Sequence, residues 1–233
     1  MPTNLADRVA LITGGGTGVG RAIALALAEK GVSVAVNYSR SKEDAEKTAA
    51  DIETNGVRSL AVQADVSNER DVLQMFERIK DTFGRLDILV NSAGYTKYLD
   101  HHDLDGHTAD VWRRTLGVNL EGNFLCSREA IRLMSENGWG SIVNIVGTAG
   151  MTGLGSSIAY SASKAGIISV TRSLALAFAP EIQVNAVSPG WIRDTRWSDG
   201  KDDIIEHAER ATPMGRLAET SDIAETAIFL LTG

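Results

Sequence analysis

Short runs of apolar, largely β-branched residues alternate with longer stretches of helical periodicity along the whole chain. Most of the short runs are apolar at nearly every position, which is typical of strands that are buried on both faces. We predict strands at residues 8–13, 32–37, 58–63, 86–91, 140–146 and 182–188. We predict helices at residues 18–30, 42–55, 69–83, about 110–137 and 160–178. This alternation indicates an α/β fold, a doubly wound parallel sheet with right-handed crossovers and helices on both faces.

Two of the predicted helices have residues at their ends that favour termination. Ser67 precedes an acidic first turn and is predicted to be the N-cap of the helix at 69–83, and Gly31 is predicted to end the helix at 18–30. The chain has no internal repeat and no low-complexity linker. We therefore expect a single domain over residues 1–233.

The composition indicates a globular protein without a polyanionic partner. The 233 residues are 43% hydrophobic, and 23 Lys and Arg against 30 Asp and Glu give a net charge of −7. Neither sign is gathered into a long run, so we expect no nucleic acid and no membrane surface as a partner. No secretory signal is visible and no run approaches the roughly 18 apolar residues of a spanning helix. We expect a cytoplasmic protein in which the single cysteine, Cys126, is a small packed residue.

A glycine-rich stretch, TGGGTGVG, joins the first predicted strand to the first predicted helix. Glycines let the backbone turn sharply and approach a ligand, and a helix start presents unpaired N–H groups to phosphate. In a doubly wound sheet the ligand lies beyond the carboxyl ends of the strands. This context favours a dinucleotide site over a merely tight turn. The predicted binding residues are Gly14, Gly16, Thr17, Gly18, Val19 and Gly20.

The ends of the second and third predicted strands favour NADP(H) over NAD(H). The second strand lacks the acidic residue that holds the ribose 2′-hydroxyl of NAD, whereas Ser39 and Arg40 follow it. A guanidinium matches a 2′-phosphate in charge and geometry, although a lone arginine is often only solvated. Asp65, beside Val66, is placed to accept a hydrogen bond from the adenine amino group, and its alternative role is to cap the following helix.

Tyr160 stands four residues before Lys164 in the stretch AYSASKAG. At this spacing on a helix the two side chains share a face. A nearby ammonium favours the phenolate, so we expect the tyrosine pKa to fall from about 10 towards neutrality. Such a phenol would exchange a proton with a carbonyl oxygen during hydride transfer. The same pair also occurs on ordinary helix surfaces, so the prediction depends on the glycine loop.

Several of these stretches together resemble the short-chain dehydrogenase/reductase family. The resemblance covers essentially the whole chain, in order and at the family's spacings. It rests on TGGGTGVG, on NSAG at 91–94, on Asn119 within GVNLEGNF, on YSASK at 160–164 and on NAVSPGWI at 185–192. The tail at 212–231 resembles the branch that contains 3-oxoacyl-(acyl carrier protein) reductases.

This resemblance implies a Rossmann fold and an NADP(H)-dependent oxidoreductase that interconverts a ketone, such as a 3-oxoacyl thioester, and a secondary alcohol. It implies Tyr160 as general acid/base, Lys164 as partner of the nicotinamide ribose and of the tyrosine, and Asn119 as a helix residue that holds a water in a proton relay. It also implies a homodimer or homotetramer through the helices around 110–137 and 160–178. The implied lining residues are Asn91, Ala93 and Gly94 near the adenosine ribose and Pro189, Gly190 and Ile192 near the carboxamide.

One catalytic position departs from the family pattern. Gly147 stands where the family has a serine that donates a hydrogen bond to the substrate oxygen. The loss of one such donor costs about 100- to 1000-fold in turnover. Thr148 can replace it only if the loop shifts, so Ser92, Ser156 or the substrate would have to supply the contact. We expect a weakened reductase whose turnover rises on Gly147→Ser, and the alternative is a non-catalytic dinucleotide-binding protein of the same fold.

Two further departures concern the end of the chain. Asp194 stands where the family has a threonine close to the cofactor, with Thr195 one place later, so either the loop slips or the affinity for the pyrophosphate falls. The chain stops at FLLTG, before the last strand that the family adds, and we expect an exposed sheet edge.

The remaining candidates favour structural roles or the substrate cleft. Three histidines and three aspartates at 100–107 have no second ligand cluster, so we predict no metal and a solvated loop beside the cleft; a metal-assisted hydrolase is the alternative. Trp191, Trp197 and Met214 are candidates for an apolar substrate lid or for ordinary packing.

Overall fold

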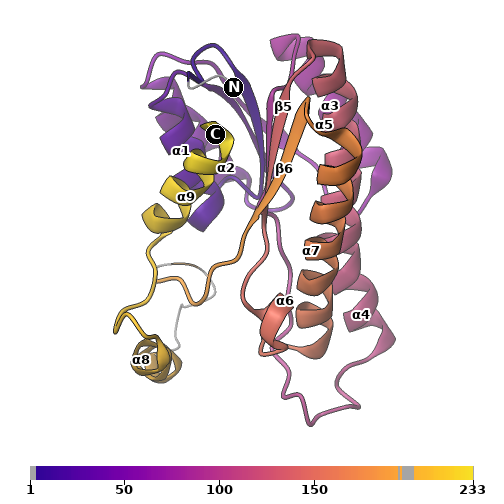
Figure 1. Ribbon diagram of the computed structural model, residues 1–233, viewed down its shortest axis with the longest axis vertical. Helices are drawn as coiled ribbons and strands as arrows, with labels where there is room; N and C mark the ends of the chain where they lie inside the picture. Colours follow the sequence, from indigo (N-terminus) through magenta and orange to yellow (C-terminus); the bar gives the residue numbers. More distant parts are fainter. Residues whose placement is uncertain (1–3, 194, 196–201, 233) are drawn as a thin grey trace.

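A six-stranded parallel sheet runs through the middle of the protein in the order β3-β2-β1-β4-β5-β6 (Figure 1). The computed structural model describes residues 4–193, 195 and 202–232. Every pair of neighbouring strands is parallel. All six predicted strands are confirmed within two residues at each end. They are β1 Val9–Thr13, β2 Ser33–Tyr38, β3 Ser59–Gln63, β4 Ile88–Asn91, β5 Gly140–Ile145 and β6 Ile182–Val187.

The central strands are covered on both faces, which explains their continuous apolar runs. In β1, Val9 and Leu11 belong to the core on one face of the sheet, whereas Ala10 and Ile12 belong to the core on the other. Successive strand side chains point to opposite faces, so a strand between two helical layers needs an apolar residue at every position. The sequence pattern and the sheet order therefore have the same physical origin.

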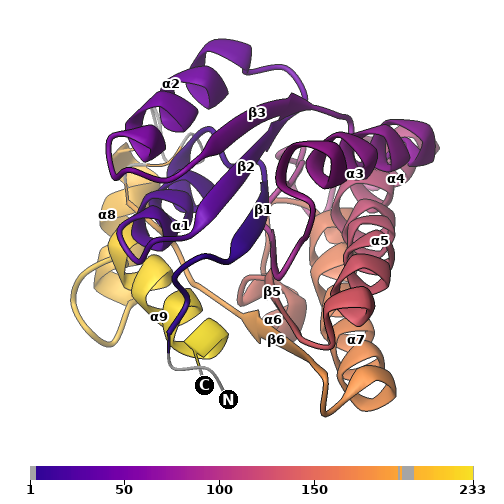
Figure 2. The same cartoon turned by 90° about the horizontal axis from the view of Figure 1, so that it is seen from above.

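Helices form one layer on each face of the sheet (Figures 1 and 2). One layer contains α1 Gly18–Ala28, α2 Lys42–Glu53 and α9 Thr220–Thr232; the other contains α3 Glu69–Phe83, α5 Gly122–Asn137 and α7 Ile158–Phe178. The shorter helices are α4 Ala109–Leu116, α6 Ala149–Thr152 and α8 Asp202–Ala211. Among the residues that the structure describes, no helix has the length and apolar content that crossing a membrane would need.

The helix predicted over 110–137 is confirmed as one continuous helical run over 109–137, within which a π-helical turn at Gly117–Glu121 separates α4 from α5. The chain is closely packed at the end of this turn. A Cβ added at Gly122 would lie 2.8 Å from the side chain and 2.9 Å from the carbonyl oxygen of Val66, so the helix approaches the end of the third strand at this point. The apolar periodicity continues through the turn, and the sequence pattern does not reveal it.

The predicted N-cap of α3 is wrong. Asn68, not Ser67, holds the first turn, because its side-chain oxygen accepts from the amides of Arg70 at 3.0 Å and Asp71 at 3.4 Å. Both residue types are good N-caps, and only the extended backbone at Asn68 selects it. Cys126 is fully buried, and burial raises the pKa of its thiol to about 12, which confirms a packed and unreactive residue.

Candidate active site

A cavity of about 1190 Å³ opens beyond the carboxyl ends of the strands. It extends from the glycine loop after β1, past the ends of β2, β3 and β4, to the first turn of α7. Most of the residues predicted to bind cofactor or substrate lie on its wall. They are Gly14, Gly16, Thr17, Gly18, Val19, Ser39, Arg40, Asp65, Val66, Ala93, Gly94, Tyr160, Lys164, Pro189, Gly190 and Ile192.

The glycine loop combines left-handed turns with close packing. Gly14 has φ +64° and Gly18 has φ +54°, and α1 begins at Gly18. A Cβ at Gly18 would have Thr195 as its nearest neighbour, at 3.8 Å. Gly20, in contrast, does not line the cavity: its Cβ would lie 2.4 Å from the carbonyl oxygen of Gly14. Gly20 is therefore required for the first turn of α1 to pack on the loop, not for ligand contact.

Bare backbone also forms the wall further along the cavity. A Cβ at Gly190 would meet no atom within 4 Å, and one at Gly94 would meet only Asn119 Oδ1, at 3.9 Å. Both glycines line the cavity, so a flat ligand can lie directly against the chain at these two positions.

The end of β2 carries one buried anchor and one exposed cation. Asn37 is buried and donates through Nδ2 to the carbonyl oxygen of Ala64 at 3.1 Å, while its Oδ1 accepts from the amide of Gly14 at 3.4 Å. This side chain therefore joins the glycine loop to the strand ends. Arg40 lies on the cavity wall, is exposed, and has no ion-pair partner within the described part of the chain.

Asp65 is held in place by Arg114, a residue that the sequence did not single out. Arg114 Nη1 lies 3.0 Å from Asp65 Oδ2 and 2.9 Å from Ser67 Oγ, and its guanidinium carbon lies 5.7 Å from the centroid of the Tyr95 ring. Burial opposes ionisation of Asp65, but hydrogen bonds from Ser67 and Arg114 outweigh it and lower the pKa of the carboxyl. Asp65 is thus an ionised acceptor on the cavity wall. It does not cap α3.

Tyr160 and Lys164 share a face of α7 at the inner end of the cavity, as their spacing predicts. Lys164 Nζ lies 5.5 Å from the centroid of the Tyr160 ring and donates to the carbonyl oxygen of Ile145 at 2.9 Å. The expected fall in the tyrosine pKa is wrong for this geometry. Burial, with a smaller contribution from Tyr98, raises the pKa of Tyr160 to about 12, and burial lowers that of Lys164 to about 8.

The side chain of Asn119 is engaged by the protein and does not line the cavity. Its Oδ1 accepts from the amide of Tyr95 at 2.7 Å, and its Nδ2 donates to the carbonyl oxygen of Tyr95 and to Ser163 Oγ, both at 3.0 Å. These bonds join the π-helical turn, the segment after β4 and α7. Asn119 therefore fixes the wall of the site, and its role in a proton relay stays a prediction.

Asn91 likewise lies beneath the site, not in it. The side chain is buried, and Nδ2 donates to Asn144 Oδ1 at 2.9 Å and to Ser127 Oγ at 3.0 Å. Asn91 does not line the cavity, where it was expected beside the adenosine ribose, whereas Ser92, Ala93 and Gly94 do. An asparagine at a strand end is equally suited to a buried network, and only the packing of α5 decides the matter.

Gly147 lies beside the hydroxyl of Tyr160. Its φ is +115°, and a Cβ built on it would lie 3.8 Å from Tyr160 Oη and 3.8 Å from the carbonyl oxygen of Pro189. There is consequently space for a side chain, but the backbone conformation is one that residues other than glycine rarely adopt. The neighbouring Thr148 is exposed, and its amide donates to the Pro189 carbonyl at 2.9 Å.

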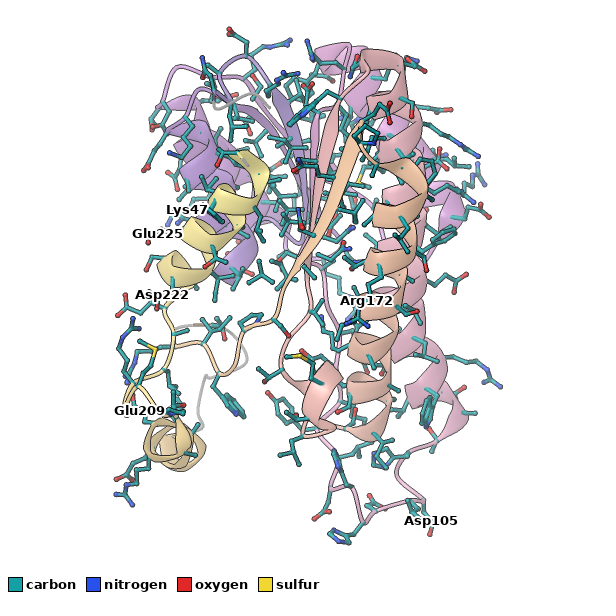
Figure 3. The ribbon with its side chains drawn as sticks, in the orientation of Figure 1. Lys47, Asp105, Arg172, Glu209, Asp222 and Glu225 are labelled. Carbon is teal, nitrogen blue, oxygen red and sulfur yellow. The ribbon has the colours of Figure 1, made fainter. Side chains whose placement is uncertain are left out.

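Of the residues that were candidates for an apolar lid, the structure describes two, and one of them lines the cavity. Trp191 lines the cavity and is 39% exposed, whereas Met214 is 74% exposed and does not line it. Asp194 and Trp197 lie outside the described residues. Glu209 on α8, labelled in Figure 3, pairs with Arg193 and so joins α8 to the segment that contains Trp191.

The histidine loop is engaged in contacts within the protein. Among the residues that the structure describes, no group of three or more His, Cys, Asp or Glu side chains could hold a metal ion. His101 and His102 line the cavity, and a ring nitrogen of His107 accepts from the amide of Ile158 at 3.2 Å, at the start of α7. No local pattern indicates this contact, because it joins residues 51 positions apart.

Comparisons with known proteins agree with this geometry. The family model described as Enoyl-(Acyl carrier protein) reductase matches residues 14–233. The chain is 41% identical over 226 residues to ketoacyl reductase 2 of the granaticin polyketide synthase of Streptomyces violaceoruber, covering 96% of this chain and 89% of that one. It is 39% identical over 222 residues to the 3-oxoacyl-(acyl-carrier-protein) reductase FabG of Staphylococcus aureus, covering 95% and 89%. A crystal structure named as a short-chain alcohol dehydrogenase of Sinorhizobium meliloti superposes with a TM-score of 0.91 at 35% identity, over 99% of this chain and 91% of that one.

Proposed function

The chain belongs to the short-chain dehydrogenase/reductase family of oxidoreductases, and from that premise we propose that residues 1–233 form a single NADP(H)-binding domain that reduces a ketone to a secondary alcohol. The proposed substrate is a 3-oxoacyl thioester or a similar carbonyl compound, as in the names of the relatives. One observation carries the proposal: Tyr160 and Lys164 line the same cavity as the glycine loop and Arg40.

The shape and chemistry of the cavity suit a dinucleotide. The N-terminus of α1 would face the pyrophosphate, the bare backbone at Gly94 and Gly190 would lie against the flat rings, and Asp65 would accept from the adenine amino group. Arg40 is proposed to pair with the 2′-phosphate, which favours NADPH over NADH. When bound, this cofactor would supply the hydride for the carbonyl carbon.

The proton for the carbonyl oxygen is proposed to come from Tyr160. Because burial holds its pKa at about 12, the phenol is protonated at neutral pH and ready to donate. Lys164, with its pKa lowered to about 8, is still largely charged at pH 7 and would stabilise the phenolate that remains. This protonation state favours the direction of carbonyl reduction. Asn119 is proposed to act by holding Tyr95 and α7 in register.

Gly147 favours one alternative, a dinucleotide-binding protein that has lost efficient chemistry. Without the family's serine, Tyr160 would be the main donor to the developing oxyanion, and one missing donor costs about 100- to 1000-fold. The two candidates differ in whether NADPH is consumed. A panel of oxoacyl thioesters and diketones, followed by loss of the absorbance of reduced nicotinamide, separates them. Tyr160→Phe should lower any genuine rate at this site by at least about 100-fold.

Cofactor choice has a matched test. Arg40→Ala should weaken NADPH binding about tenfold in titration calorimetry, because it removes a charge-assisted contact, and should leave NADH binding unchanged. Arg70→Ala is the control, since Arg70 is exposed and lies outside the cavity wall. Equal loss for both dinucleotides would contradict the 2′-phosphate assignment, and no binding of either would contradict the proposed function.

The assembly and location also remain proposals. Phe124 on α5 and Leu176 on α7 are 41% and 86% exposed, which supports a dimer or tetramer through these helices. Sizing with light scattering would test it. A cytoplasmic location is proposed from the likeness to the reductases above.

A further inference from the structure

Two loops that are far apart in sequence lie against each other beside the first turn of α7. The amide of Leu99 donates to the carbonyl oxygen of Ser156 at 2.8 Å, and the hydroxyls of Thr96 and Ser156 lie 2.6 Å apart. A ring nitrogen of His101 lies 3.1 Å from the carbonyl oxygen of Gly155. Figure 3 labels Asp105 in the same loop, at the end of the molecule where α7 begins. The loop before α4 therefore supports the segment that leads into Tyr160.

The contacts of His107 determine its tautomer. Its Nδ1 lies 2.7 Å from the carbonyl oxygen of Asp103, which can only accept, so Nδ1 carries the proton. The amide of Ile158, which can only donate, points at Nε2 over 3.2 Å, so Nε2 offers a lone pair. The two bonds are satisfied together only by a neutral ring in the Nδ1–H form.

The bond to Ile158 completes the cap of the helix that carries Tyr160. The first amides of a helix have no partner within it. Ser157 Oγ accepts from the amide of Tyr160 at 3.2 Å, and His107 Nε2 accepts from that of Ile158. Two amides of the first turn are thus held from outside, one by the N-cap residue and one by a side chain of the opposite loop. The direction in which the phenol points depends on both.

Resting on the proposed function, we propose that His107 is a positioning residue for Tyr160, which holds the first turn of α7 only while its ring is neutral. A second proton on Nε2 would place an N–H against the N–H of Ile158. It would also put a positive charge at a helix N-terminus, which is itself electropositive. Acidification should therefore loosen the turn that aims Tyr160.

Other titratable groups lie on the elements around this ring. The ring of His101 meets it edge to face, with centroids 6.4 Å apart. The carboxylate of Asp103 accepts from the amide of Gly106 at 2.9 Å. From α4, Asp110 pairs with Arg113 at 2.8 Å. Tyr160, from α7, is neutral at these pH values because its pKa is about 12.

Two substitutions separate the capping role from the titration. His107→Gln retains an amide oxygen for Ile158 and an amide donor for Asp103 but does not change charge. Its kcat near neutral pH should therefore stay within about twofold of the wild type, and the fall in kcat that acidification causes in the wild type should disappear. His107→Leu removes the acceptor, so kcat should fall about three- to tenfold at every pH while KM for NADPH stays unchanged. His102→Gln is the control for the loss of a histidine: because His102 lines the cavity, kcat itself can change, but the acid-side fall should remain, since this ring pairs with Asp100 and does not contact α7 through Ile158.

A second measurement does not depend on turnover. Nitrogen NMR of the histidine rings should report the Nδ1–H tautomer for His107 in the wild type, and the amide of Ile158 should exchange about three- to tenfold faster in His107→Leu than in His107→Gln. Wild-type kcat and exchange in the leucine variant would overturn the proposal, as would an acid-side fall that persists in the glutamine variant or vanishes in the His102 control. If the protein reduces no carbonyl, the NMR and exchange results still decide the role of His107, and only the proposed function fails.

Discussion

Serine and alanine at position 147 should separate the backbone cost of this site from its chemistry. Both residues carry a Cβ on a backbone with φ +115°, so both should lose about 1–3 kcal/mol of stability through strain. For a chain of this length that loss corresponds to a Tm about 2 to 12 °C lower. The Cβ itself fits, since its near neighbours Tyr160 Oη and the Pro189 carbonyl oxygen are both 3.8 Å away. Only the serine adds a hydrogen-bond donor, one bond beyond the Cβ.

The ratio of kcat between the serine and alanine variants therefore isolates the effect of the hydroxyl. One donor to a developing oxyanion stabilises the transition state by about 3–4 kcal/mol, so Gly147→Ser should raise kcat at least about tenfold over Gly147→Ala and should also exceed the wild type. The assay is NADPH consumption with a diketone, alongside thermal unfolding of both variants. Equal kcat for serine and alanine would refute the reasoning, because the position would then contribute no oxyanion contact. An unchanged Tm in both variants would show that a side chain at position 147 does not strain the backbone.

Three further predictions follow from the geometry of the site. The wild-type kcat for reduction should fall above about pH 8, because the pKa of Lys164 is lowered to about 8 and its ammonium is present below this pH and lost above it. Lys164→Arg should remove the fall, and a pH profile that stays unchanged in this variant would assign the fall to another group. Arg114→Gln should raise the Kd for NADPH about fivefold in titration calorimetry with little change in kcat, because Asp65 loses its partner at 3.0 Å; an unaltered Kd would remove Asp65 from the adenine site. Gly20→Ala should lower Tm by about 5 °C or more, since its Cβ would lie 2.4 Å from the Gly14 carbonyl oxygen, and a wild-type unfolding curve would contradict this packing.

The elements that the sequence predicts well are those controlled by local periodicity. The six strands are apolar because both faces of the sheet are covered, and α3 is predicted to the residue because its apolar stripe is clear. The π-helical turn at Gly117–Glu121 escapes the same method. The turn leads into Gly122, which packs closely against Val66 from a distant part of the sequence, and the apolar pattern passes through it unchanged.

The same distinction between local pattern and tertiary contact applies to the site residues. The spacing of Tyr160 and Lys164 places them on one face whatever surrounds them, but the sign of the tyrosine pKa shift depends on burial, which outweighs the ammonium. Asn91 and Asn119 have the residue types expected of ligand contacts, yet their partners come from α5, α7 and the segment after β4.

By itself, the sequence determined the alternating α/β order, the edge of the sheet where the cavity opens and the residues that reach that edge, because strand and helix periods and glycine sterics act over a few residues. Only the tertiary structure decided which side chains are buried, which backbone Gly147 adopts and which partners the His107 ring meets. Those properties depend on removal from water and on partners brought from elsewhere in the chain, and no local pattern encodes either.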